Sequence, residues 1–282
     1  MITRRHAAIL IAAVAWPGLH ARTDAHTISL PRNEGTVPML DFGGRPVVEL
    51  LVNGKGPFRL VVDTGAAVTV LDSSLAAELS LRDTDVQLQD VRMGAVTLSG
   101  LNAFVVPLAG LLRGEGAPRG VLSASAFPGH LVTFDYPGRQ LRVARGTLPA
   151  ADGRVLFSYQ GADLPSVPVR VAGREITVHL DTGAPYALAL PTRYMKDLPL
   201  AGEPVQRGMA RTHSGSKPIY AATLAGDIAI GDFTLPTREL RFTDVVPDPH
   251  AVPKGQVGGE ALRDFVLTLD SSNQRLRLER PS

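Results

Sequence analysis

The tetrapeptide Asp-Thr-Gly-Ala occurs twice in the chain, each time directly after an apolar run. The first copy spans residues 63–66 within VVDTGAAVTV, and the second spans residues 181–184 within VHLDTGAPYALAL. An Asp at the end of a buried strand is costly unless its carboxylate has partners, while Thr supplies a hydroxyl and Gly permits a turn. A single copy is consistent with a turn that merely ends a strand. Two copies in matching contexts indicate that the chain repeats itself, which restricts the possible folds severely.

Three stretches of the first half return in the second half in the same order. The matching stretches are 47–71 with 166–190, 90–106 with 227–242, and 120–143 with 255–278. Asn-Gly or Pro-Gly separates two apolar runs in 47–71 and in 120–143, which is typical of β-hairpins. The 28 Gly and 22 Pro also favour a turn-rich β protein over a helical one. We therefore predict an all-β, mainly antiparallel, bilobal fold with pseudo-twofold symmetry and a few short helices.

The join between the two predicted lobes falls at GTLPAADGR, residues 146–154, where Gly, Pro and small residues cluster. We expect an N-terminal lobe over residues 26–148 and a C-terminal lobe over residues 149–282. The chain of 282 residues is long enough for two lobes of about 100–150 residues each.

Two segments predict short helices. DSSLAAELSL begins with Asp72 and Ser73, either of which is a good N-cap, and PTRYMKDL begins with Pro191, which is favoured in the first helical turn.

One segment has no counterpart in the first half. The second half carries a long insertion within residues 200–227, and its centre has strand-like arms around a Gly/Ser turn. This pattern predicts a projecting hairpin around residues 208–222. The first half has no room for such a hairpin between Leu71 and Asp90.

The N-terminal residues 1–25 have the pattern of an export signal. Two arginines precede an apolar stretch over residues 7–16, which is too short to span a bilayer comfortably. Cleavage is expected after Ala21 or Ala25, and the alternatives are an uncleaved anchor or a buried N-terminal helix. We therefore expect an exported protein, either periplasmic in a bacterium or secreted, with no stable membrane insertion beyond this segment.

The composition excludes several classes of chemistry. The chain has no Cys, so disulfides, thiolate nucleophiles and Cys-rich metal sites are ruled out. The seven His form neither H-E-x-x-H nor H-x-x-x-H, so we expect no metal and no cofactor. The net charge is only +2 and no run of basic residues occurs, so we expect no nucleic-acid partner.

A pseudo-twofold axis between the lobes would bring the two repeated turns together. Asp63 and Asp181 would then face each other, and like charges a few Å apart cannot both ionise comfortably. One carboxyl would keep its proton and act as a general acid, while the other would act as a general base on a shared water. Such a pair hydrolyses a carbonyl compound without a metal or a thiol.

The apolar run followed by Asp-Thr-Gly-Ala, twice, resembles aspartic peptidases of the retropepsin/pepsin type, with two retropepsin-like halves fused in one chain. The resemblance covers roughly residues 40–280, and its Ala after each Gly is closer to retropepsins than to pepsins. It implies that Asp63 and Asp181 are catalytic and that Thr64 and Thr182 form an interlocking grip between the loops. The remaining members of the implied active-site turns are Gly65, Ala66, Gly183 and Ala184.

The chain departs from this family pattern in two respects. The later apolar-apolar-Gly element is Gln256-Val257-Gly258 in the second half but ends in Ser123 in the first half, which predicts crowding behind the first turn. The predicted flap is single and belongs to the C-terminal lobe. Tyr220 is the nearest candidate for a flap aromatic, although its position is more typical of an ordinary strand residue.

These features predict an exported aspartic endopeptidase that hydrolyses a peptide or protein substrate. We expect a monomer whose halves form an intramolecular pseudo-dimer, active at a pH nearer to neutral than pepsin. One alternative is a catalytically impaired protein of the same fold that binds peptides or an envelope component. Another is that each lobe pairs with a lobe of a second chain.

Overall fold

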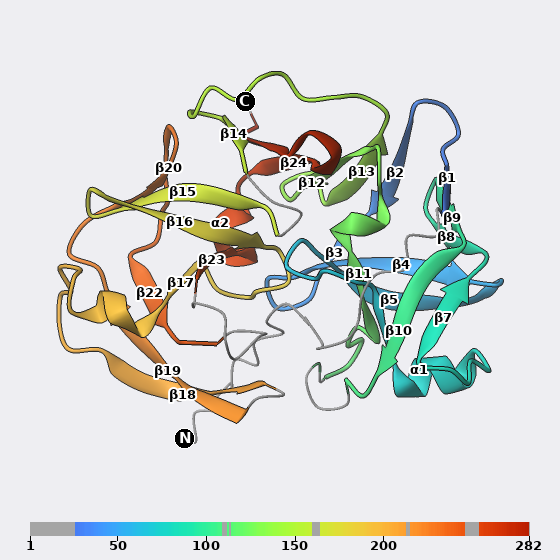
Figure 1. The fold of residues 1–282 in the computed structure, drawn as a ribbon, viewed down its shortest axis with the longest axis horizontal. Coiled ribbons are helices and arrows are strands. Elements are labelled where there is room, and N and C mark those ends of the chain that lie inside the picture. Colours follow the sequence, from blue (N-terminus) through green and yellow to red (C-terminus); the bar gives the residue numbers. More distant parts are fainter. Residues whose placement is uncertain are drawn as a thin grey trace.

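The computed structural model describes residues 26–108, 112, 114–159, 164–212, 215–245 and 254–281. These residues form three β-sheets with a few short helical turns, as Figure 1 shows. The all-β prediction is confirmed, with some parallel strand pairs among the antiparallel ones. The predicted signal peptide, residues 1–25, lies outside the described residues.

The first sheet is built entirely from the first half of the chain. Its ten strands run in the order β1-β9-β8-β4-β5-β11-β6-β10-β7, with β3 added to β4. Their bounds are β1 Thr27–Ser29, β3 Leu40–Asp41, β4 Pro46–Val52, β5 Lys55–Asp63, β6 Val70–Asp72, β7 Asp85–Leu88, β8 Val91–Met93, β9 Val96–Ser99, β10 Leu101–Val106 and β11 Gly120–Ser123.

The second sheet is built entirely from the second half. Its nine strands run in the order β18-β19-β22-β17-β23-β16-β15-β20-β21. Their bounds are β15 Ser166–Val171, β16 Arg174–Asp181, β17 Leu188–Leu190, β18 Val205–Thr212, β19 Gly215–Thr223, β20 Ile228–Ile230, β21 Phe233–Thr234, β22 Glu239–Phe242 and β23 Gly255–Gly258.

A third sheet joins the halves and lies above them in Figure 1. Its six strands run in the order β14-β25-β24-β12-β13-β2, so three come from each half. The two sets meet where β12 pairs antiparallel with β24, from Leu131 opposite Asp270 to Asp135 opposite Val266. The strand bounds are β2 Glu34–Pro38, β12 Leu131–Asp135, β13 Gln140–Ala144, β14 Leu156–Ser158, β24 Val266–Asp270 and β25 Arg275–Glu279.

The strand pairing of the first two sheets repeats in detail. In the first half β5 pairs parallel with β11, and β6 pairs antiparallel with β11 and parallel with β10. In the second half β16 pairs parallel with β23, and β17 pairs antiparallel with β23 and parallel with β22. The sequence repeat therefore corresponds to a repeat of strand topology around each Asp-Thr-Gly turn.

The β4–β5 hairpin of the first half and the β15–β16 hairpin of the second half have two-residue turns of the same backbone conformation. Asn53 and Gly54, between β4 and β5, have φ of 51° and 76°, and Ala172 and Gly173, between β15 and β16, have φ of 48° and 83°. Positive φ at both central residues is the turn that matches the twist of a two-stranded hairpin. The predicted hairpins over 47–63 and 131–143 are confirmed.

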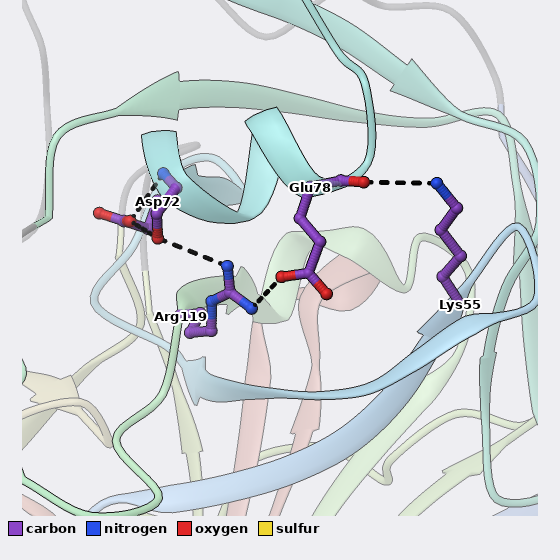
Figure 2. Close-up of polar contacts among 5 residues, drawn as sticks. Lys55, Asp72, Glu78 and Arg119 are labelled. Atoms are coloured by element: carbon purple, nitrogen blue, oxygen red, sulfur yellow. Dashed lines mark hydrogen bonds and ion pairs between the residues drawn. The ribbon is translucent and has the colours of Figure 1, made fainter.

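The helical elements are short. They are α1 Ser73–Glu78, α2 Gly259–Leu262 and the 3-10 turns η1 Ala124–Ala126, η2 Thr192–Met195 and η3 Ser271–Asn273. Asp72 caps α1 as predicted, accepting from the Ser74 amide at 2.9 Å. At the other end of α1, Arg119 pairs with Glu78 at 2.6 Å and Lys55 donates to the Glu78 carbonyl at 3.3 Å (Figure 2). The helix predicted after Pro191 is the 3-10 turn η2.

The predicted projecting hairpin is present in the second half. β18 and β19 pair from Val205 opposite Ala221 to Thr212 opposite Gly215, and residues 213–214 between them lie outside the described part. The first half, wholly described over 71–90, places only the end of β6, α1 and β7 there. Tyr220 lies in β19 opposite Gln206, as expected for a strand residue. We call the β18–β19 hairpin the flap below.

One large apolar cluster runs through both halves and the shared sheet, with a smaller cluster beside each Asp-Thr-Gly turn. The shared sheet contributes Phe134 and Leu267, both fully buried. The turns therefore sit between rigidly packed layers. No helix among the described residues has the length and apolarity needed to cross a bilayer.

Candidate active site

Each of the two repeated turns follows the last residue of a buried strand. Asp63 ends β5 beside Ser123 of β11, and Asp181 ends β16 beside Gly258 of β23. The two Asp residues are 1% and 0% exposed. Parallel neighbours thus hold each Asp at an equivalent place in its own sheet.

The threonines tie the two turns to each other. The Thr64 hydroxyl accepts from the Thr182 amide at 3.0 Å and donates to the Leu180 carbonyl at 2.6 Å. The Thr182 hydroxyl accepts from the Thr64 amide at 3.0 Å and donates to the Val62 carbonyl at 2.8 Å. These four reciprocal bonds form an interlocking grip of the kind that the family resemblance implied.

The glycines show that the two carboxyls meet. A Cβ on Gly65 would lie 2.7 Å from Cγ of Asp181, and a Cβ on Gly183 would lie 2.5 Å from Cγ of Asp63. Each carboxyl therefore lies against the glycine of the opposite turn, where a side chain has no room. The two carboxyls are close enough to share a hydrogen bond when one of them carries a proton.

The two carboxyls have unequal surroundings. Asp63 Oδ1 accepts from the Gly65 amide at 2.6 Å and from the Gly183 amide at 3.3 Å. Neither oxygen of Asp181 has a partner at hydrogen-bonding distance and angle among the described residues, and the Ala184 amide is the one backbone donor that lowers its pKa. Amide donors stabilise the charged form of a carboxyl, so the arrangement favours ionised Asp63.

Burial raises the pKa of both acids, but by unequal amounts. Burial raises the pKa of Asp63, and the hydrogen bonds from the Gly65 amide and its other donors lower it in part. The pKa of Asp181 is raised well above its ordinary value by burial and then by the charge of Asp63. The two groups titrate as a pair, and the larger upward shift of the Asp181 pKa favours the shared proton on Asp181.

The residues behind the two turns differ. A Cβ on Gly258 would lie 2.7 Å from the Ala184 carbonyl oxygen and would also run into the Tyr186 carbonyl, so glycine is required there. In the first half Ser123 donates to the Ala66 carbonyl at 2.6 Å. The crowding predicted for Ser123 is therefore not found, because the hydroxyl satisfies a turn carbonyl instead of pressing on it.

The two alanines of the turns pack inward. Ala66 is 5% exposed within the apolar cluster of the first half, and Ala184 is 1% exposed within that of the second. Methyl groups at these places add apolar contact and no hydrogen bond to the turns. Their role here is packing.

Sequence reasoning missed three polar residues around the turns, of which Arg45 and Tyr186 are buried and Tyr136 is half-buried. Arg45 is 8% exposed and its Nε donates to the Gly183 carbonyl at 2.8 Å. Tyr186 donates to Gln256 at 2.5 Å, and the Tyr136 hydroxyl is buried without a partner among the described residues. Burial raises the pKa of Tyr136 and of Tyr186 above the ordinary value, so both hydroxyls stay neutral.

A signal for one of these residues was present in the repeat. Extending the match of 47–71 with 166–190 by two residues sets Arg45 opposite Leu164. Arg45 precedes a buried strand in the first half, whereas the apolar Leu164 precedes the matching strand in the second half. This difference indicates that the two positions have different roles. Neither tyrosine stands out in this way.

The described residues contain no cluster of His, Asp and Glu that would hold a metal ion. A family model described as aspartyl protease matches residues 48–126 and 167–269, more than half of the chain, with one segment in each half. A comparison with curated proteins gives no match.

Proposed function

The chain belongs to the aspartyl protease family, and we propose that it is an endopeptidase in which Asp63 and Asp181 activate a water molecule. The observation that carries this proposal is the meeting of two buried carboxyls, each against the glycine of the other turn. A protein that only bound peptides would have no chemical need for such a pair, which is costly to bury.

The unequal surroundings of the acids assign their roles. Asp63, which has the amide donors, is the general base that takes a proton from the attacking water. Asp181, which holds the shared proton, is the general acid that protonates the carbonyl oxygen of the substrate. The tetrahedral diol then collapses as Asp63 returns its proton to the leaving nitrogen, and Asp181 regains a proton from a diol hydroxyl.

The threonine grip fixes the geometry of this step. Four hydrogen bonds through Thr64 and Thr182 lock the two turns before any substrate binds. Positioning of this kind avoids reorganisation during the reaction. The grip therefore serves the reaction without touching the reacting atoms.

The flap supplies the surface for an extended substrate. Val205 and Met209 of β18 are 50% and 44% exposed, which is unusual for large apolar side chains in this molecule. We assign to the flap the task of covering a bound peptide and excluding water, as mobile hairpins do in other enzymes.

The test is digestion of a peptide library between acidic and neutral pH by the wild type and by Asp63→Asn and Asp181→Asn. Each substitution removes one member of the acid–base pair, so we expect cleavage to fall by at least about 10²–10⁴-fold. Asp90→Asn, which alters an exposed ion pair with Arg92, is the matched control and should keep wild-type activity. Cleavage that persists in Asp63→Asn would remove the basis of the proposal.

The same assay separates the non-catalytic alternative. A protein that binds peptides or an envelope component without turnover would show saturable peptide binding and no product at any pH. Product formation that a pepstatin-type inhibitor abolishes would exclude this alternative. The chain retains both acids and the grip, which favours turnover.

The proposed setting is outside the cytoplasm, with the active unit a monomer. The export-signal pattern of residues 1–25 supports the first part, and the grip between halves of one chain supports the second. N-terminal sequencing of the mature protein should begin after Ala21 or Ala25. Light scattering of the active protein should give the mass of one chain; an active species only at twice that mass would favour pairing between chains.

A further inference from the structure

Arg45 reaches from the first half of the chain into the active-site turn of the second half. It lies directly before β4, and its Nε donates to the Gly183 carbonyl at 2.8 Å. With 8% exposure it is among the few buried charged residues of the described chain. Arginine is almost never buried without partners, and the Gly183 carbonyl is one partner of this guanidinium.

The loop that carries Arg45 is tightly built. Phe42 and Arg45 exchange backbone hydrogen bonds of 3.0 and 3.3 Å, and Asp41 accepts from the Gly44 amide at 2.8 Å. On its outer side Gly44 packs against the second turn, because a Cβ there would lie 3.6 Å from the Pro185 carbonyl oxygen. The guanidinium is therefore delivered by a fixed loop, which suits a positioning role.

Gly183 connects Arg45 to the acids. Its carbonyl accepts from Arg45, its amide donates to Asp63 at 3.3 Å, and its Cα faces the Asp63 carboxyl without room for a side chain. A shift of Gly183 would move both the amide that donates to Asp63 and the Cα that packs against the Asp63 carboxyl. The bond from Arg45 thus restrains the second turn at the point where it touches the first Asp.

The guanidinium is also a charge beside the pair. It interacts electrostatically with Asp181 and Asp63, and burial lowers its own pKa from the ordinary value without making it neutral at physiological pH. The position related by the repeat is Leu164, which carries no charge. Of these two related positions, only the one in the first half places a cation beside the pair.

Building on the proposed function, we propose that Arg45 is a positioning residue that restrains the Thr182-Gly183 turn and stabilises the singly ionised Asp63–Asp181 pair. A nearby cation favours the charged form of a carboxyl, so it opposes the effect of burial on both acids. Without it, the pair would begin to ionise at a higher pH. Arg45 thus contributes to where on the pH scale the enzyme works.

Other titratable groups lie close to Arg45 and the two acids. Tyr136, Tyr186 and Asp41 surround the guanidinium and the acids, and Arg241 stacks over the Tyr186 ring at 5.3 Å. The tyrosines stay neutral because burial raises their pKa, so they add no charge over the working range. Arg139, Glu260 and Arg263 line the surface pocket next to Arg45 and are exposed to solvent, where charges are screened.

The experiment compares Arg45→Gln, which removes the charge and keeps an amide donor, with Arg45→Lys, which keeps the charge and loses the planar fork. The readouts are the pH profile of kcat/KM, the separate values of kcat and KM, and carbon-13 NMR titration of the Asp63 and Asp181 carboxyls. Arg139→Gln is the matched control, since Arg139 lines the same pocket but is exposed.

We expect Arg45→Gln to move the first ionisation of the pair, and the acidic limb of the profile, upward by roughly 0.5–1 pH unit. Arg45→Lys should keep the titration of the wild type but lower kcat several-fold at unchanged KM. Arg139→Gln should change neither. An unchanged titration in folded Arg45→Gln overturns the electrostatic role, and wild-type kcat in Arg45→Lys overturns the positioning role.

The NMR titration keeps this test separate from the test of the proposed function. If no peptide is cleaved by the wild type, the endopeptidase proposal fails, but the carboxyl titrations still decide whether Arg45 acts on the pair. If Arg45→Gln does not fold, Arg45→Met measured in the same way takes its place as the neutral variant, with the same expected upward shift and the same overturning result.

Discussion

Behind Asp63 the first half places Ser123, whose hydroxyl donates to the Ala66 carbonyl, whereas behind Asp181 the second half places Gly258, where no side chain fits. The first half supplies Arg45 to the site, and the second half has Leu164 at the related position. The second half has the flap, and the first half has none over its described residues 71–90.

The features that the two halves share differ in kind from the features that they do not share. The shared features are strand pairing, the Thr grip and the two glycines against the acids, all of which bring the carboxyls together. The unequal features are amide donors, a cation and a flap. Symmetry is needed to bring two like groups into contact, and asymmetry is needed to give them different protonation states.

The largest expected effect comes from the shared glycines. Gly65→Ala and Gly183→Ala each place a methyl group against the opposite Asp carboxyl, so we expect at least about 100-fold loss of kcat/KM from each, through displacement of the acid whose catalytic role we propose. Peptide cleavage measures the loss. Gly202→Ala, where an added Cβ meets nothing within 4 Å, is the control. Normal activity in Gly65→Ala or Gly183→Ala would contradict the claim that both glycines are needed to position the opposite carboxyl.

The residues behind the turns should respond very unequally to exchange. Gly258→Ser drives a side chain into turn carbonyls, and we expect a loss of about 3 kcal/mol in the free energy of unfolding. Ser123→Gly loses the hydroxyl that donates to the Ala66 carbonyl and contacts the Ser125 amide and hydroxyl, and it gains backbone freedom, for about 1–2 kcal/mol. Urea unfolding measures both variants. Equal losses would show that the halves tolerate each other's residue.

The grip should respond equally on both sides. Thr64→Val and Thr182→Val each remove one hydroxyl that makes two hydrogen bonds, and we expect each to cost about 2 kcal/mol of unfolding free energy. Chemical denaturation of the two variants side by side is the measurement. A difference larger than about 1 kcal/mol would mean that the grip is not symmetric in energy, although it is in geometry.

The smallest effects concern pH and have opposite signs at two acids. The pKa of Asp181 is raised in the fold, so its contribution to stability is present below the unfolded value of 3.8 and is lost as pH rises through the folded pKa. Asp181→Asn should therefore be at least as stable as the wild type at neutral pH, while inactive. Thermal unfolding against pH tests this, and a variant that is less stable at neutral pH would contradict it.

Asp72 provides the contrast. Although burial opposes it, hydrogen bonds from Ser74 and Leu108 lower the pKa of Asp72, so its stabilisation is present above 3.8 and is lost as pH falls through the folded pKa. Asp72→Ala should lose about 1 kcal/mol at neutral pH and less in acid. The same thermal scans report it, and a loss that grows in acid would reverse the assignment.

The sequence was sufficient for features that leave a local pattern. The Asn53-Gly54 turn, the cap at Asp72 and the strand-like arms of the flap each follow from residue types at fixed spacing. The meeting of the two turns followed from the repeat together with a pseudo-twofold axis. These elements depend on neighbours in sequence or on symmetry, so they were predictable.

What depended on tertiary neighbours was not predictable. Whether Ser123 crowds its turn depends on which way the Ala66 carbonyl points, and sequence does not encode that direction locally. The helix predicted after Pro191 is only the 3-10 turn Thr192–Met195, and it has no side-chain cap hydrogen bond. Arg45 lies 138 residues from the carbonyl it binds. Nothing in its immediate sequence indicates that contact.

The sheet that combines strands of both halves has a consequence for how the molecule can change. Two separate identical subunits would have to carry every substitution twice and would find each other only by collision, so that their assembly would weaken on dilution. Here one covalent chain, closed by the β12–β24 ladder, keeps the halves at a constant effective concentration. Each half is thereby free to accept a substitution alone, which is the condition under which a lone arginine and a lone flap can arise.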